Sequence, residues 1–374
     1  MELYWLSSRR LLAFLAGLLT ILVLGVGILW LRAGRPLSFG GRNISDLPDT
    51  ARSLIRAPKA TPTPVLVPSL LTGELVAPDA ANLRPLGVMI ENHPDARPQS
   101  GLASANLVYE AIAEGGITRF LAVFADPRAD VRVGPIRSAR SYFVDFATEL
   151  GAMYAHVGGN LSALQQIDAT KGFFDLNQFA IGGPTFWRDN SRKVATEHTM
   201  YSATNKLWQY AAEKRKYDTK ASFTPWQFAN EPPVASRAAA QTITVNFSSA
   251  SYKVDWAYDP TANNYTRAMA GKPHLDATNS KVITAKTVIL HTVSHQMVTG
   301  PDKEREWKLS LTGSGSARVF MNGTETAATW KKSGASRTKY FDSNGQELVF
   351  PRGNIWVEII HPETSMSITT PTQQ

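Results

Sequence analysis

The chain has 374 residues, of which 43% are hydrophobic and 19% charged, with 9 Trp, 11 Tyr and 16 Phe. At roughly 150 residues per domain this length predicts two or three domains, and the composition excludes wholesale disorder. The sequence contains no Cys, which excludes disulfides, thiolate metal sites, Cys nucleophiles and a lipid-modified N-terminal Cys.

The net charge of +8 is unevenly spread along the chain. Half of it, +4, lies in the first 42 residues, so the remaining 332 residues carry only +4. This charge is too weak to neutralise many phosphates, and we therefore expect no nucleic-acid partner.

The N-terminal segment predicts a membrane anchor. Residues 11–31 are 21 residues without a charge, and a helix needs about 20 residues to cross the hydrocarbon core. The run is longer than the apolar stretch of a cleaved signal peptide, which spans about 7 to 15 residues. We expect a cytoplasmic stub at 1–10, an uncleaved single-pass transmembrane anchor at 11–31, and the bulk of the chain outside the cell membrane.

Beyond the anchor, the sequence predicts a Pro-rich stalk over 32–78, an α+β domain over 79–229, a β-rich domain over 230–364 and a tail over 365–374. Prolines between 57 and 69 disfavour a helix and favour an extended spacer. The predicted fold class is therefore α+β, with a mixed α/β first domain and a β-rich second domain after one transmembrane helix.

The elements of the first predicted domain mix two periodicities. Apolar runs predict strands over 86–90, 107–112, 117–124 and 153–157, and Gly115-Gly116 predicts a two-residue hairpin turn. Helical spacing predicts helices over 138–150, 160–167 and 204–216.

After residue 233 the apolar period changes to two. Alternation predicts strands over 242–247, 282–290, 317–321, 346–350 and 355–360. Asn-Gly pairs between the later strands are typical of hairpin turns.

Several motifs resemble the YerB-like family of bacterial envelope lipoproteins, which contains domains of unknown function. They are VMIENHPDARPQSGL, ANLVYEAIAEGGITRFLAVF and VGPIRSARSYF in the first predicted domain, and NNYTRAMAGKPHLD and GNIWVEII in the second. The resemblance implies a membrane-tethered envelope protein of two domains, but no established reaction. Because this sequence has no Cys, an uncleaved helix would replace the lipid as anchor.

Two glutamates and an arginine flank the predicted hairpin. With a two-residue turn, Glu110 lies opposite Leu121, and Glu110, Glu114 and Arg119 share one face. Such a set fits a structural ion-pair ladder, a cation or sugar site, or an acid/base pair. The last interpretation is strained, because the two carboxylates would lie about 13 Å apart on a strand.

Arg137, Ser138 and Arg140 lie about the start of a predicted helix, where free N–H groups and guanidinium groups bind anions. The alternative is that these arginines pair with glutamates inside the fold. Strand ends also place further polar side chains at one opening, and these are Glu91, Asn92, Arg97, His156 and His198.

His291 and His295 have the spacing of a helical zinc pair but lie in a β-like segment without the intervening Glu. We therefore expect no metal site there, and the sequence predicts no cofactor. The leading hypothesis is an anchored extracytoplasmic binding or accessory protein that engages an anionic or sugar-containing cell-wall polymer, or an envelope protein. The alternatives are a cell-wall hydrolase with Glu110, Glu114 and His156 as catalytic residues, and a structural scaffold.

Overall fold

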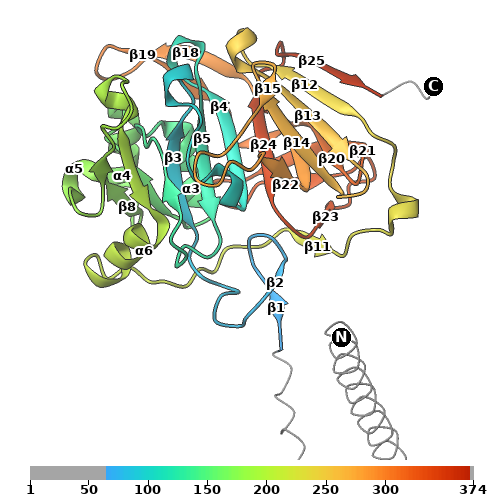
Figure 1. Cartoon of the computed structure of the whole chain (residues 1–374), viewed down its shortest axis with the longest axis horizontal. Helices are drawn as coiled ribbons and strands as arrows, with labels where there is room; N and C mark the ends of the chain where they lie inside the picture. The colour runs from blue at the N-terminus through green and yellow to red at the C-terminus, as the bar shows by residue number, and fades with distance from the viewer. Residues whose placement is uncertain (1–64, 371–374) are drawn as a thin grey trace, which may run out of the picture. The chain divides into compact units, whose positions relative to one another are not determined.

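A ten-stranded mixed sheet runs through the computed structural model of the protein, which describes residues 65–370 (Figure 1). In spatial order its strands are β22 (Lys339–Phe341), β21 (Thr324–Lys332), β20 (Gly313–Met321), β17 (Thr287–Thr292), β24 (Ile355–Ile360), β4 (Leu107–Ile112), β5 (Thr118–Phe124), β3 (Leu86–Glu91), β7 (Met153–His156) and β8 (Phe174–Asn177).

A second sheet has six strands. Its order is β15 (Lys272–Pro273), β14 (Asn264–Met269), β13 (Lys253–Asp259), β12 (Thr242–Asn246) and β25 (Ser365–Thr369), and β16 (Thr284–Ala285) also pairs with β14. Short strands form four further small sheets: β1 (Val67–Pro68) with β2 (Leu75–Val76), β10 (Met200–Ala203) with β6 (Arg132–Val133) and β9 (Trp187–Arg188), β11 (Gln227–Ala229) with β23 (Val349–Pro351), and β18 (His295–Thr299) with β19 (Arg305–Leu309).

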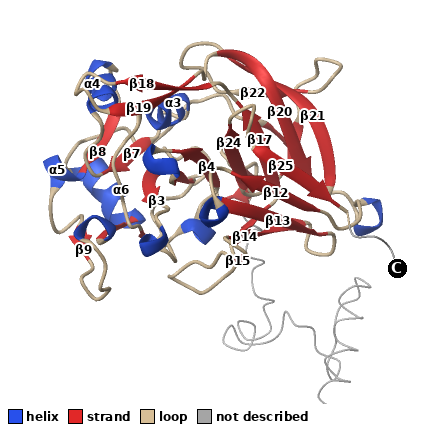
Figure 2. Ribbon diagram, turned by 90° about the horizontal axis from the view of Figure 1, so that it is seen from above, coloured by secondary structure: helices blue, strands red, loops and turns tan. Residues whose placement is uncertain are grey.

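The α-helices of residues 65–370 are short and lie in the half of the molecule that holds β7 and β8 (Figure 2). They are α3 (Ser141–Glu149), α4 (Leu161–Ala169), α5 (Gln178–Ile181) and α6 (Thr204–Glu213). Among residues 65–370, no helix has both the length and the apolar character that crossing a membrane requires. The predicted anchor at 11–31 and the stub at 1–10 lie outside the described residues.

The predicted fold class is wrong, because strands dominate both halves of the described chain. The segment expected to form a mixed α/β domain contributes β3, β4, β5, β7 and β8 to the long sheet. Its predicted helices do form, as α3, α4 and α6. These helices are short, the longest spanning ten residues, and they pack against a ten-stranded sheet.

Both faces of the long sheet are buried, and this explains the nearly continuous apolar runs of its strands. On one face, Val88 and Trp356 share a buried cluster with Trp256 of the second sheet. On the opposite face, Met89 shares a cluster with Phe143 of α3. Successive side chains of a strand point to opposite faces, so β3, β5 and β24 are buried along their whole length.

Strand β24 lies in the middle of the long sheet, although it is one of the last elements of the chain. It pairs in parallel with β17 on one side and with β4 on the other. The sheet is thus shared by strands on both sides of residue 230, where the sequence places a domain boundary, and residues from Val65 onward form one compact unit. The boundary itself stays a prediction.

The turn between β4 and β5 differs from the predicted one. It spans Ala113–Ile117 and contains the 3-10 turn η4 (Glu114–Gly116), where Gly115 and Gly116 have positive φ. Glu110 therefore lies opposite Phe120 rather than Leu121. The predicted register is wrong by one residue, and such a slip moves a side chain to the other face of the sheet.

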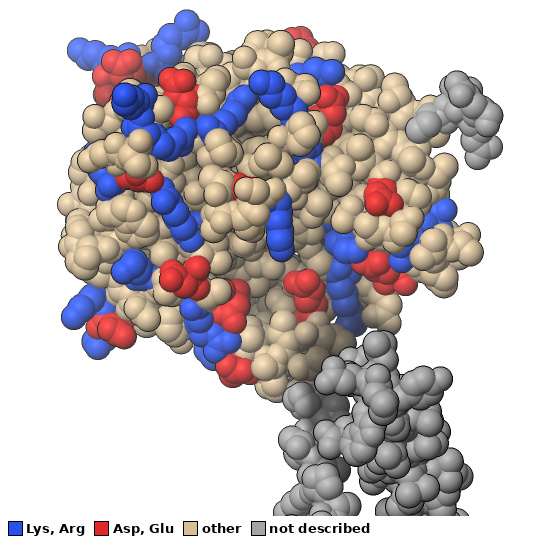
Figure 3. All heavy atoms as spheres, in the orientation of Figure 1, with Lys and Arg blue, Asp and Glu red and all other residues tan. Residues whose placement is uncertain are grey.

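Both ends of the described chain are more ordered than the sequence suggests. Leu71, within the predicted stalk, is 3% exposed and belongs to the core. Residues 365–369, within the predicted tail, form β25 and pair with β12. Basic and acidic side chains are interspersed on the face shown in Figure 3, in keeping with the weak net charge of this part of the chain.

Candidate functional site

The register of the long sheet separates the predicted site residues into two groups. Arg119 lies opposite Ala111 on β4 and opposite Glu91 on β3. Glu91 and Arg119 therefore share the face that packs against α3, whereas Glu110 points to the face that packs against the second sheet. The predicted set of Glu110, Glu114 and Arg119 on one face does not form.

Glu110 belongs to a fully buried polar network between the two sheets. Its carboxylate forms an ion pair with Arg267 of β14 and accepts a hydrogen bond of 2.6 Å from the Thr118 hydroxyl. Glu358 of β24 lies beside Glu110 in register, with Oε1 3.8 Å from Nη2 of Arg267. Burial, and next the charge of Glu110, raise the pKa of Glu358 well above its usual value. The protonated form of Glu358 is thereby favoured.

The same network contains Asn92 and Arg97. The Asn92 amide donates 2.6 Å to the Thr118 hydroxyl, and its Oδ1 accepts from Nε of Arg97 at 3.0 Å. Gln99 links Asn92 to His274 of the second domain through bonds of 2.9 and 2.8 Å. These contacts hold the two sheets together from the inside.

On the opposite face, the arginines of the GPIRSAR segment are paired within the protein. Arg140, the residue before α3, donates to both oxygens of Glu114 at 2.5 and 2.6 Å. Burial favours a higher pKa for Glu114, but the hydrogen bonds and charge of Arg140 outweigh it, and the pKa is lowered. Arg119 donates to the Ser138 carbonyl at 2.9 Å, and burial, with the nearby charge of Arg140, lowers its pKa to about 10.

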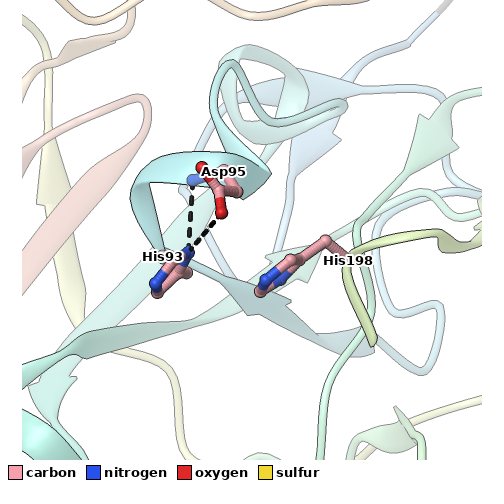
Figure 4. Close-up of side chains that lie close together, drawn as sticks. All are labelled: His93, Asp95 and His198. Carbon is pink, nitrogen blue, oxygen red and sulfur yellow. Dashed lines mark hydrogen bonds and ion pairs between the residues drawn. The ribbon is translucent and has the colours of Figure 1, made fainter. Parts of the chain in front are cut away.

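A histidine pair lies at the end of β3 (Figure 4). Nδ1 of His198 lies 2.7 Å from Oε2 of Glu91, whose other oxygen is 3.2 Å from Nε of Arg137. The ring of His93 stacks on His198 with centroids 4.8 Å apart and planes within 10°. Nδ1 of His93 also lies 3.7 Å from Asp95. The structure thus brings together three predicted binding residues, Glu91, Arg137 and His198.

His93, Asp95 and His198 are the residues of this site that could hold a metal ion. They offer one ligand atom each, within 4.8 Å of one another, and imidazole and carboxylate groups suit zinc and related ions. A ring nitrogen binds a metal in the plane of its ring, and nearly parallel stacked rings direct their lone pairs along separate planes. One ring would have to turn before both nitrogens reached the same ion.

His156 lies apart from both groups and is fully buried. Its Nδ1 is 2.6 Å from the Gly158 carbonyl and its Nε2 is 2.7 Å from Oδ1 of Asp175. Both ring nitrogens are therefore engaged by the loop and strand that follow β7.

A concave site with a volume of about 620 Å³ lies between the N-terminal halves of α3 and α4 and the β18–β19 hairpin. Two aromatic residues, Tyr142 and Trp307, form part of its wall. The Trp307 indole N–H donates to the Ala113 carbonyl at 3.2 Å, and this bond fixes the hairpin against the turn that carries Glu114. The polar residues of the wall include Ser141, Asp145, Ser162, Gln166, Glu306 and Lys308.

Hydrogen bonds hold the carboxylates of this pocket in place. Glu306 accepts from the Ser162 hydroxyl at 2.6 Å and from the Asn160 amide at the start of α4, where a negative charge suits the helix dipole. Asp145 accepts from Gln166 at 2.6 Å, and burial, which outweighs the charge of Lys332, raises its pKa.

The sequence did not point to this pocket. Asp145 and Tyr142 lie on a helix whose apolar spacing marked it only as part of the core, and Trp307 and Glu306 lie on a hairpin distant in sequence. The adjacent Glu306 and Trp307 are the one local signal in the sequence, and they do not indicate which helices the hairpin packs against. His291 and His295 lie on β17 and β18, with Nδ1 atoms 3.0 Å from the Tyr340 hydroxyl and 2.9 Å from the Val293 carbonyl.

Comparisons with known proteins agree in sequence and in fold. Residues 71–218 match the family described as protein of unknown function (DUF3048), N-terminal domain, and residues 243–357 match its C-terminal domain. The putative lipoprotein YerB of Bacillus subtilis (strain 168) is 30% identical over 325 residues, which cover 86% of this chain and 91% of the relative. The crystal structure of YerB protein from Bacillus subtilis matches with a TM-score of 0.72 and 29% identity, covering 81% of this chain and 100% of that one.

Proposed function

Because this chain belongs to the DUF3048 family, and its relative in Bacillus subtilis is a putative lipoprotein, we propose that it is a membrane-associated binding protein of the cell envelope. Its ligand is a sugar-containing polymer, which enters the pocket between α3, α4 and the β18–β19 hairpin. The observation that carries this proposal is the combination of Trp307 and Tyr142 with Asp145 and Glu306 in one wall.

The lining of this pocket suits a sugar ring on two counts. The C–H face of a sugar packs against a flat aromatic surface such as that of Trp307, which gains burial of apolar area. Sugar hydroxyls need acceptors and donors in turn, and the wall supplies carboxylates, an amide, hydroxyls and an ammonium group. The volume also lies within the range of about 300–1,000 Å³ that is typical of small-ligand sites.

The arginines that the sequence favoured as an anion site support this proposal less well. Arg137 and Arg140 each form an ion pair with a glutamate of the protein, at 3.2 and 2.5 Å. A ligand anion would have to displace Glu91 or Glu114. We therefore propose that the polymer binds in the pocket with Trp307, between α3, α4 and the β18–β19 hairpin, rather than at the arginines that precede α3.

Binding of purified cell-wall glycan fragments to the full chain tests the proposal. Titration calorimetry should show saturable binding that weakens at least tenfold in Trp307→Ala and severalfold in Glu306→Gln. Phe179→Ala is the matched control, because Phe179 is an aromatic residue of α5, 77% exposed and outside the pocket. Equal affinity in Trp307→Ala and Phe179→Ala would refute the location of the site.

A hydrolase is the second candidate, because two carboxylates line the same pocket and burial raises the pKa of Asp145. Glycoside hydrolysis uses two carboxyl groups, and the one that acts as general acid has a raised pKa. Soluble products detected by mass spectrometry, and lost in Asp145→Asn with binding retained, would establish turnover. Binding without products identifies an accessory protein.

The proposed location at the membrane rests on the family and on the predicted anchor. Attachment through residues 11–31 stays a prediction, since these residues lie outside the described part of the chain. An envelope protein is the alternative partner, and a glycan that fails to bind the full chain would direct attention to it.

A further inference from the structure

A second pocket lies at the end of β21 and is lined by basic residues. It has a volume of about 440 Å³, and the charged residues of its wall are Lys331, Lys332, Arg337 and Lys339. Ser314, Ser333, Ser336 and Thr224 add hydroxyl groups to the same wall. All of its charged residues thus have the same sign.

Arg337 is the unusual member of this wall. Its side chain is 4% exposed and packs on Trp226, with the guanidinium carbon 3.9 Å from the ring centroid. Within residues 65–370, none of its three guanidinium nitrogens has a hydrogen-bond partner. A guanidinium carries five N–H donors, and leaving such a buried group unsatisfied is costly enough to require an explanation.

The buried carboxylate of Glu149, on which the charge of Arg337 acts, does not supply the missing partner. Oε1 of Glu149 accepts from the Tyr109 hydroxyl at 2.8 Å, and its Oε2 accepts from the Thr338 hydroxyl at 2.7 Å and from Lys332 at 2.9 Å. The pKa of Glu149 is lowered because Lys332, and then Arg337, outweigh its burial. The charge of Arg337 therefore acts on Glu149, but the N–H groups of Arg337 donate to no acceptor among residues 65–370.

The charges around the pocket leave an excess of positive charge. Glu149 pairs with Lys332, and Glu347 pairs with Lys339 at 2.7 Å. Lys331 forms no ion pair within the described part of the chain and lies over the Phe341 ring at 4.7 Å. Arg337 and Lys331 thus remain as two cations without a contacting carboxylate among residues 65–370.

We propose that this pocket binds a phosphate group, either free or in a phosphodiester of a polymer. A guanidinium fork holds two phosphate oxygens at once, and an ammonium adds a point charge. The hydroxyls of the wall donate to the remaining oxygens. This proposal does not rest on the pocket between α3, α4 and the β18–β19 hairpin, because the two pockets share no wall residue. Either site can therefore be tested while the other is intact.

Calorimetric titration of the full chain with inorganic phosphate and with a glycerol phosphate oligomer tests the proposal. We expect saturable binding that weakens at least tenfold in Arg337→Gln and about threefold in Lys331→Gln, and that falls with rising salt. Lys272→Gln is the matched control, since Lys272 is an exposed lysine of β15 that lies outside both pockets, and its loss should leave phosphate binding unchanged.

The two probes distinguish the source of the phosphate. Binding of both, with the oligomer displacing free phosphate, identifies a polymer ligand, whereas binding of inorganic phosphate alone identifies a small anion. If Arg337→Gln fails to fold, the exposed Lys331→Gln variant still decides the matter. Absence of saturable binding of both probes to the natural chain, or equal affinity in Lys331→Gln and Lys272→Gln, would overturn the proposal and leave ordered water as the partner of Arg337.

Discussion

Replacing Arg267 by Met should destabilise the protein strongly. The Arg267 guanidinium forms an ion pair with Glu110 and lies 3.8 Å from Glu358, and all three side chains are fully buried. Methionine keeps much of the length of the side chain but leaves the Glu110 carboxylate without its cation. Removal of one partner from a buried ion pair costs about 3–5 kcal/mol in the free energy of unfolding.

A second substitution separates the electrostatic and packing contributions to this loss in the free energy of unfolding. Glu110 contacts the Arg267 guanidinium more closely than Glu358 does, so Glu110 is the carboxylate that loses its ion pair in Arg267→Met. Adding Glu110→Gln removes that charge, and we expect the double variant to recover part of the loss. The remainder reflects lost packing, since the guanidinium carbon of Arg267 lies 4.5 Å from the centroid of the Trp356 ring.

Urea unfolding of the full chain, followed by tryptophan fluorescence, measures these effects. Arg318→Met is the matched control, because Arg318 pairs with Glu325 on the surface and both side chains are 32% exposed. Such a pair contributes about 0–1 kcal/mol. If Arg267→Met and Arg318→Met lost the same free energy of unfolding, the network would not stabilise the contact between the sheets.

Three further predictions concern acid stability, an ion pair and the anchor. Burial lowers the pKa of His291 to about 3, so the unfolded chain binds a proton that the folded chain excludes, and the free energy of unfolding should fall by about 1.4 kcal/mol per pH unit as the pH falls from about 6.5 to about 3. In urea unfolding at a series of pH values, His291→Phe should remove that share of the slope, and an unchanged slope would contradict this assignment. Arg140→Gln and Glu114→Gln should each cost about 1.5–3 kcal/mol in thermal unfolding, and the double variant should cost less than their sum; simple additivity would show that the two side chains do not interact. Deletion of residues 11–31 should move the protein from the membrane to the soluble fraction of lysed cells, and retention in the membrane would argue against this anchor.

Local elements of the fold could be predicted from the sequence because their signals are local. The apolar run at 107–112 and the alternation at 355–360 coincide with β4 and β24. The sheet order could not be predicted, since parallel pairing of β24 with β4 joins residues about 250 positions apart. The predicted fold class was wrong because short helices give as clear a periodicity in the sequence as the strands that they cover.

For the site residues too, local neighbours could be predicted from the sequence and long-range packing could not. Glu91 and His198 are predicted at strand ends and Arg137 at a helix start, and the structure brings these three into contact. Asn92 and His156, predicted for the same opening, lie elsewhere. The turn at Gly115-Gly116 was read as two residues long, and this slip placed Glu110 and Arg119 on one face. The pocket with Trp307 depends on the packing of a hairpin against α3 and α4, and no local pattern in the sequence predicts that packing.

The central position of β24 has a consequence for how the chain acquires its fold during synthesis. Until residues 355–360 have been made, β4 and β17 each present an open edge of unpaired backbone groups, and such edges attract other strands. Most of the long sheet must therefore wait for the last twentieth of the chain, and a product cut short before Ile355 should aggregate rather than persist as a smaller folded protein. Pairings this distant in sequence also form slowly, so the chain depends on protection of its first half while the second is still emerging.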